Sequence, residues 1–103
     1  MKSVYVEPGK PAVITEATLD EIKLSLGWLS CAYPYEDDIA FVHDDDGIAN
    51  NRAPNRTING ELMPGQFYIL SVDNHGELCS LSDAQAERYL TMFKEPERFP
   101  AGR

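Results

Sequence analysis

The stretch Gln66-Phe67-Tyr68-Ile69-Leu70-Ser71-Val72 carries the strongest strand pattern in the chain. β-Branched and aromatic residues favour strands, and successive side chains of a strand point to opposite faces of the sheet. Phe67 and Ile69 therefore share one face. Tyr68 and Leu70 share the other, so both faces are largely apolar. A strand that is apolar on both faces is typical of the centre of a sheet.

Shorter apolar runs on both sides of this stretch predict the other strands. They cover residues 3–6, 12–15, 28–33, 39–43 and 78–81, with a weak strand at residues 48–49. Segments rich in proline, glycine and aspartate separate these runs and predict turns, among them Asp44-Asp45-Asp46-Gly47 and Met63-Pro64-Gly65. Residues 50–59 show no periodicity, and we predict an ordered loop there.

Two capping boxes predict where the helices begin. In a capping box, the hydroxyl of the N-cap residue accepts a hydrogen bond from the backbone three residues later, and the side chain at that later position reaches back to the N-cap backbone. Thr18 and Glu21 form one such pair, and Ser82 and Gln85 form the other. The first helix is predicted to end at Gly27, because glycine favours the left-handed conformation at a helix C-terminus.

The order of these elements predicts the α+β class. A chain of 103 residues is long enough for one domain with one core. We expect an antiparallel or mixed β-sheet of about five strands, with two short α-helices packed on one face. Residues 1–96 are expected to form a single compact domain, and residues 97–103 a loosely ordered C-terminal tail.

Net charge is the composition feature that stands out. The chain has 9 basic and 17 acidic residues, which gives a net charge of −8. An acidic chain repels phosphate backbones and anionic lipids, so we expect no direct binding of nucleic acid or membranes. No apolar run approaches the roughly 20 residues needed to span a bilayer. Residues 1–7 lack the pattern of a signal peptide, and we expect a cytoplasmic location.

Sequence motifs indicate no catalytic site, cofactor or metal. There is no G-x-S-x-G motif and no glycine-rich phosphate loop. Asp44-Asp45-Asp46-Gly47 resembles part of a calcium loop, but Val42 and Ala53 would occupy its first and twelfth positions, and neither can bind a cation. Cys31 and Cys79 lie in strand-like runs and are expected to be buried thiols. We therefore expect a protein without enzymatic activity, while a hydrolase built from side chains distant in sequence stays an open alternative.

Acidic clusters flank the predicted strand at residues 39–43. Their members are Glu36, Asp37, Asp38, Asp44, Asp45 and Asp46. At about 3.3 Å per strand residue, the two clusters lie about 20 Å apart, which is too far for paired acid–base catalysis. We interpret them as an outward acidic face that binds a basic protein surface, such as that of a nucleic-acid-binding nuclease.

Arg52, Asn55 and Arg56 form a second polar group in the predicted loop. Guanidinium groups bind carboxylates and phosphates through two parallel hydrogen bonds, so this group could bind a small ligand or a peptide. In the interpretation that we favour, the asparagine side chains bond to their own backbone and the arginines neutralise nearby aspartates. The ligand-binding alternative places four aromatic side chains near the pocket: Tyr33, Tyr35, Phe67 and Tyr68.

The order of several short motifs resembles that of one protein family. The motifs are Val6-Glu7-Pro8-Gly9-Lys10-Pro11, Leu26-Gly27-Trp28, Tyr33-Pro34-Tyr35-Glu36-Asp37, the acidic turn with Gly47, Asn55-Arg56, Gly65-Gln66-Phe67-Tyr68-Ile69 and Ser80-Leu81-Ser82-Asp83. From Val4 to about Pro96, their order and spacing are similar to those of the domain of unknown function 3846 family of small bacterial, phage- and plasmid-borne proteins. The chain departs from the family in having Gly27-Trp28 where two glycines tend to follow the first helix.

The family has no assigned catalytic residues, so the resemblance implies a biological setting and no particular site residues. Small acidic proteins of phages and plasmids frequently counter host defence, either as DNA mimics or by blocking a nuclease. By this genomic association, the resemblance implies an anti-CRISPR or antirestriction inhibitor that acts through the acidic face. The alternative is an accessory domain that binds a small molecule or a peptide.

Overall fold

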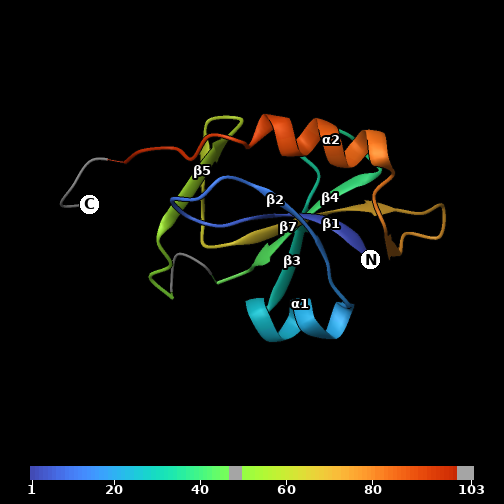
Figure 1. Ribbon diagram of the computed structural model, residues 1–103. Helices are drawn as coiled ribbons and strands as arrows, with labels where there is room; N and C mark the ends of the chain where they lie inside the picture. Colours follow the sequence, from blue (N-terminus) through green and yellow to red (C-terminus); the bar gives the residue numbers. More distant parts are fainter. Residues whose placement is uncertain (47–49, 100–103) are drawn as a thin grey trace.

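The chain folds into one antiparallel sheet, a separate β-hairpin and two helices (Figure 1). The computed structural model describes residues 1–46 and 50–99, so the weak strand expected at residues 48–49 lies outside the described residues. The strands are β1 Lys2–Val6, β2 Val13–Glu16, β3 Leu29–Ala32, β4 Ile39–Asp44, β5 Pro54–Ile58, β6 Glu61–Pro64, β7 Phe67–Val72 and β8 Leu78–Cys79. The helices are α1 Leu19–Leu26 and α2 Asp83–Met92.

The main sheet is built around β7. Its strand order is β2-β1-β7-β4-β3, and β8 pairs with the end of β7 to give six strands. All of these pairings are antiparallel. The central position predicted for residues 66–72 and the α+β class are therefore confirmed.

The two helices cover opposite faces of the sheet, so the prediction that both pack on one face is wrong (Figure 1). Phe41 of β4 packs on the side of α2, together with Tyr89. Val42, the next residue of β4, packs on the side of α1, together with Ile22. Because β4 and β7 are apolar on both faces, each face needs its own cover.

Both predicted capping boxes are present. The backbone N–H of Glu21 donates to Thr18 Oγ1 at 3.1 Å, and that of Gln85 donates to Ser82 Oγ at 3.1 Å. The reciprocal bonds from the Thr18 and Ser82 backbone N–H groups are both 2.8 Å long. Gly27 caps α1 with a φ of 79°, as predicted. Neither helix in the described part of the chain is long and apolar enough to cross a membrane.

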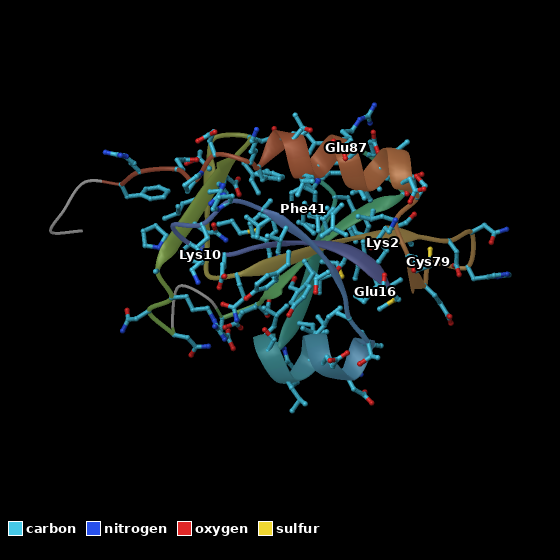
Figure 2. The ribbon with its side chains drawn as sticks, in the orientation of Figure 1. Lys2, Lys10, Glu16, Phe41, Cys79 and Glu87 are labelled. Carbon is cyan, nitrogen blue, oxygen red and sulfur yellow. The ribbon has the colours of Figure 1, made fainter. Side chains whose placement is uncertain are left out.

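A cluster of aromatic rings fills the core between the sheet and α2. Phe41 is fully buried at its centre (Figure 2). Its ring stacks on that of Phe67, with 5.5 Å between the centroids, and meets Tyr89 and Phe93 edge-on at 5.8 Å. Such aromatic pairs stabilise a core beyond the effect of their buried area.

Residues 54–64 form a hairpin where the sequence analysis predicts a loop. Asn59-Gly60 makes the turn, because Ile58 pairs with Glu61 and both turn residues have positive φ, 51° and 83°. Asn-Gly is the most favourable pair for such a two-residue turn. Prolines at the two open ends of the hairpin, Pro54 and Pro64, obscure the strand pattern. The loop predicted at residues 50–59 is therefore wrong from Pro54 onward. The turn predicted at Met63-Pro64-Gly65 is wrong for Met63 and Pro64, which belong to β6, whereas Gly65 lies in a bend between β6 and β7 with a φ of 75°.

We expect Phe41→Ala to lower the free energy of unfolding by about 3 to 5 kcal/mol, because it removes the centre of the aromatic cluster and leaves a cavity. Urea denaturation at neutral pH measures this loss. Leu24→Ala is the control, since Leu24 is 87% exposed and its truncation should change stability by less than about 0.5 kcal/mol. A loss below about 1 kcal/mol in Phe41→Ala would contradict the observed packing.

Candidate functional site

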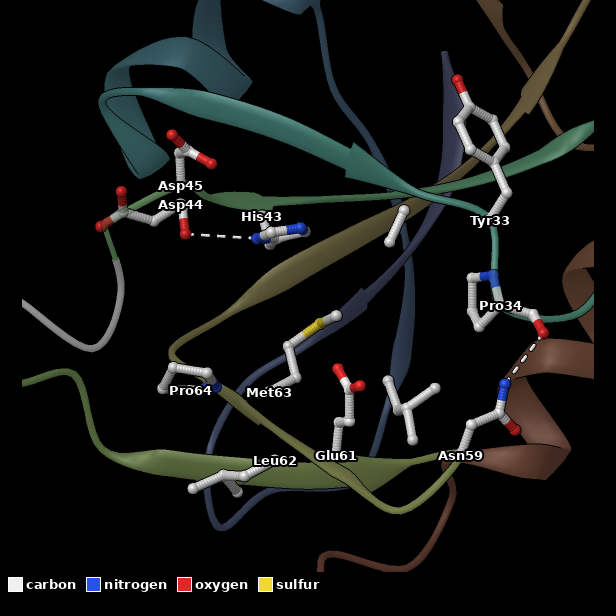
Figure 3. A pocket seen from close by; sticks show the side chains of 12 residues that line it. Tyr33, Pro34, His43, Asp44, Asp45, Asn59, Glu61, Leu62, Met63 and Pro64 are labelled. Carbon is white, nitrogen blue, oxygen red and sulfur yellow. Dashed lines mark hydrogen bonds between the residues drawn. The ribbon is translucent and has the colours of Figure 1, made fainter.

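A cleft of about 440 Å³ separates the hairpin β5–β6 from the edge of the main sheet (Figure 3). The hairpin lies on the α2 side of the sheet, where Ile58 and Met63 join the same core as α2. One wall of the cleft comes from the ends of β3 and β4 and includes Tyr33 and His43. The other comes from the hairpin, and Asn59 closes one end through a 3.0 Å hydrogen bond from Nδ2 to the carbonyl oxygen of Pro34.

Asn55 attaches the hairpin to the sheet. Its side chain is fully buried, and Nδ2 donates to the carbonyl oxygens of Val6 and Gly65 at 3.0 and 2.8 Å. The register of β5 shifts between Pro54 and Arg56, as at a β-bulge. A bulge breaks the alternation of a strand, and here it allows the consecutive residues Asn55 and Arg56 both to be buried.

Arg56 connects three distant segments of the chain. Its side chain donates to Asn55 Oδ1 at 2.8 Å, to the carbonyl of Lys10 at 2.8 Å and to the carbonyl of Phe93 at 3.0 Å. Burial lowers the pKa of Arg56, and the charge of Glu97 acts in the opposite direction. The guanidinium group stays protonated at neutral pH, because its ordinary pKa lies far above that range.

Glu97 also bonds to the hairpin itself. Its carboxylate accepts hydrogen bonds from the backbone N–H of Thr57 at 2.8 Å and from the Thr57 hydroxyl at 2.5 Å. These bonds lower the pKa of Glu97. Thus the first residue beyond the domain predicted at residues 1–96 contacts β5.

Asp44 is the second point at which the cleft wall is fixed. Its carboxylate is buried and accepts hydrogen bonds from Arg52 Nε at 2.5 Å, Asn50 Nδ2 at 3.0 Å and the backbone N–H of Asp46 at 2.9 Å. The bond from Arg52 is the main cause that lowers the pKa of Asp44. Arg52 also donates to Gln66 Oε1 and to the carbonyl oxygen of Leu26.

The side chains of Arg52, Asn55 and Arg56 are therefore engaged within the fold, which agrees with the interpretation favoured from the sequence; ligand binding was its alternative. Their recorded hydrogen bonds go to protein atoms, and Asn55 and Arg56 are buried. The favoured alternative is confirmed for Arg52, which neutralises Asp44. Arg56 instead bonds to carbonyl oxygens and an amide oxygen.

The four aromatic residues of the ligand-binding alternative do not meet at one pocket. Tyr33 lines the cleft and is 49% exposed. Tyr35 is 43% exposed and meets the ring of Phe41 edge-on, and Phe67 and Tyr68 are buried in the central strand. Tyr33 is thus the one member of this group that lines the cleft.

The first acidic cluster lies in the loop before β4, which follows the cleft residues Tyr33 and Pro34 along the chain. Glu36 is half-buried and forms an ion pair with Arg88 of α2. Asp37 and Asp38 are exposed. The carbonyl oxygen of Asp38 also accepts a 2.8 Å hydrogen bond from the N–H of Val72, which fixes this loop to β7.

The second acidic cluster lies at the cleft. Asp44 is only 4% exposed, so its assignment to an outward acidic face is wrong. Asp45 and Asp46 are exposed, and Asp45 lines the cleft. β4 lies between the two clusters, as predicted, and Glu36 and Asp44 are engaged in ion pairs within the protein.

Glu61 is a cleft residue that sequence reasoning missed. It is exposed at the start of β6 and lines the cleft opposite the β3–β4 wall, as does Leu62, which is 41% exposed (Figure 3). The Asn59-Gly60 turn is the signal that could have placed it there. No lysine or arginine lines the cleft in the described part of the chain, so its accessible charges, on Asp45 and Glu61, are negative.

The cleft is lined by one histidine, His43, and by carboxylates. Within residues 1–46 and 50–99, no three His, Cys, Asp or Glu side chains are grouped to hold a metal ion. His43 Nδ1 lies 3.2 Å from the carbonyl oxygen of Asp44, which is the hydrogen bond recorded for this ring. Nucleophilic catalysis requires a base within hydrogen-bond reach of a nucleophile, and the described contacts of His43 include no such group.

Residues 1–94 match the model of the family described as Domain of unknown function (DUF3846). The chain belongs to the DUF3846 family. The match runs from β1 through α2, so the residues of the cleft all lie within the DUF3846 domain. This membership confirms the resemblance found in the sequence motifs. Comparison with curated proteins and with solved structures gives no match.

We expect Arg56→Ala to lower the free energy of unfolding of the DUF3846 domain by about 2 to 4 kcal/mol, because it leaves several buried acceptors without a donor. Urea denaturation measures the loss. Arg98→Ala is the matched control, since Arg98 is exposed and its removal should cost less than about 0.5 kcal/mol. Equal stability of the two variants would contradict an anchoring role for Arg56.

We expect the stabilisation by Asp44 to depend on pH. Because its pKa is lowered in the folded protein, the ionised carboxylate stabilises the fold above the unfolded pKa of about 3.9, and this contribution is lost as pH falls through the folded value. The unfolding free energy of wild type should therefore exceed that of Asp44→Asn near neutral pH. The difference should shrink below about pH 4. A difference that stays constant down to acid pH would contradict this role.

Proposed function

We propose that this DUF3846 domain is a non-catalytic binding module whose cleft receives a basic segment of a partner protein. One observation carries the proposal: the cleft combines exposed carboxylates with exposed apolar side chains, and no lysine or arginine lines it among the described positions. Lysine and arginine have apolar stems and charged ends, so they match both parts of this lining.

The geometry of the cleft supports a specific mode of contact. Tyr33 and Leu62 are about half exposed and offer apolar surface to the stem of a basic side chain. Asp45 and Glu61 offer carboxylates to its charged end, and neither has an ion-pair partner among the described residues. Arg52 neutralises Asp44 from within the protein, so Asp44 forms part of the cleft wall but adds no uncompensated charge to it.

The partner class that we propose is a basic, nucleic-acid-binding protein such as a host defence nuclease. A net charge of −8 attracts basic surfaces over distances of about 10 Å at moderate salt and disfavours direct binding of DNA. The exposed Asp37 and Asp38, at the other end of β4, extend this attraction beyond the cleft. The phage and plasmid setting implied by the family resemblance supports a nuclease inhibitor of the anti-CRISPR or antirestriction type.

The cleft also favours a second candidate function. Its volume of about 440 Å³ lies within the range of small-molecule pockets, which is about 300 to 1,000 Å³. A small cationic ligand would use Asp45 and Glu61 in the same way. Thermal unfolding with polyamines and other cationic metabolites separates the two candidates, because a ligand that binds the folded state raises the melting temperature once its concentration exceeds its Kd.

The protein-binding proposal is tested with purified restriction and CRISPR nucleases, by measuring binding and inhibition of DNA cleavage at low and high salt. We expect inhibition of at least one nuclease that weakens at high salt. Glu61→Lys should weaken it at least about tenfold, because it reverses charge inside the cleft. Glu87→Lys makes the same charge change on the outer side of α2 and should have much less effect (Figure 2). Equal losses in both variants would remove the cleft as the site.

A further inference from the structure

β3 is an edge strand whose outer backbone groups are free. It is the last strand in the order of the main sheet and pairs only with β4 in the described part of the chain. The carbonyl of Trp28 accepts a 2.7 Å hydrogen bond from the N–H of Asp45. Because hydrogen-bonded pairs alternate along an antiparallel ladder, Ser30 and Ala32 also bond to β4. The N–H and C=O groups of Leu29 and Cys31 therefore point away from the sheet.

This edge carries no lysine, proline or register shift that would oppose pairing with another strand. Natural edge strands are protected by lysines, prolines or bulges, and the sequence Leu29-Ser30-Cys31-Ala32 contains neither lysine nor proline. The register with β4 runs without a shift. Cys31 is exposed because its strand lies at the edge, so the expectation that it is a buried thiol is wrong. An unprotected edge of this kind is a template for one more strand.

The free edge and the cleft are neighbours. Ala32, the last residue of β3, lines the cleft together with Tyr33. Side chains of a strand alternate between the two faces of the sheet. In a strand added beside β3, every second side chain would therefore point to the α2 side, where Asp45 and Glu61 provide negative charge.

We propose that an extended segment of the partner, with basic residues at alternate positions, pairs with the outer edge of β3 and directs its lysines or arginines into the cleft. The proposal rests on the binding function above and specifies how the partner is held. Main-chain hydrogen bonds to Leu29 and Cys31 supply affinity, and the acidic cleft selects the side chains.

The negative charge of the chain favours a basic segment over a second copy of the chain as the occupant of the β3 edge. Antiparallel pairing of two β3 edges would bring together two chains of net charge −8. Repulsion between like charges opposes that dimer, whereas a basic segment gains from the same charges.

Cys31→Pro tests the backbone pairing directly. Proline removes the outward N–H of residue 31 but no hydrogen bond to β4, and edge strands tolerate proline at such positions. Cys31→Ala keeps the N–H and is the matched control. The probe is a synthetic peptide of alternating valine and lysine, and its affinity is measured by titration calorimetry. We expect Cys31→Pro to weaken binding about tenfold and Cys31→Ala less than about twofold.

Amide hydrogen exchange in the wild-type protein gives a second measurement that does not depend on folding of the proline variant. We expect the Leu29 and Cys31 amides to exchange rapidly in the free protein and to become protected when the valine–lysine peptide binds. A peptide with glutamate in place of lysine should not protect them.

The possible failures are distinguishable. If the peptide binds and Glu61→Lys weakens it, but the Leu29 and Cys31 amides stay unprotected, strand addition is wrong and the cleft remains the binding site. If no binding occurs at millimolar peptide, strand addition is overturned, and the cleft proposal is overturned with it only if Glu61→Lys also leaves nuclease inhibition unchanged. Protection of Cys31 in the free protein that rises with protein concentration would show that a second copy occupies the edge, which also overturns strand addition.

Discussion

The buried guanidinium group of Arg56 is the interaction on which the arrangement of the site depends. It joins the bulge of β5 to the turn after β1 and to the end of α2. Asn55 adds bonds to β1 and to the segment before β7. A two-stranded hairpin is only marginally stable alone in water, so these bonds and the apolar contacts of Ile58 and Met63 fix its place on the sheet. The cleft exists because the hairpin is held at this distance from β3.

The acidic residues at the cleft have two different roles. One is neutralised inside the protein, and the others stay exposed. Asp44 and Arg52 neutralise each other inside the protein, and this pair supports the wall of the cleft. Asp45, the adjacent residue, and Glu61, across the cleft, remain exposed. The exposed negative charge attracts a basic partner over a distance. Once the partner is in contact, the uncovered edge of β3 offers it backbone hydrogen bonds. These two properties together make a basic, extended segment the best match to this surface.

The central sheet could be predicted from sequence because its signals are local. Alternation in residues 66–72 indicates a strand with two apolar faces, and the capping boxes mark the starts of both helices. The same two apolar faces imply a helix on each side of the sheet. The prediction that both helices pack on one face is inconsistent with this pattern. The hairpin was missed because proline at both of its ends obscures the alternation, although Asn59-Gly60 predicts its turn. The roles of the polar side chains were harder to predict from sequence. Asn55 and Arg56 resemble an anion-binding site, and their actual partners are distant in sequence.

The most direct measurement is the NMR spectrum of the arginine side chains in the folded wild-type protein. If Arg56 anchors the hairpin, its Nη protons should be separately resolved and slow to exchange with water, with nuclear Overhauser effects to protons near the Lys10 and Phe93 carbonyls. Arg98, which is exposed, should show averaged and rapidly exchanging signals in the same spectrum. Rapid exchange at Arg56, indistinguishable from that at Arg98, would contradict the anchor and with it the origin of the cleft.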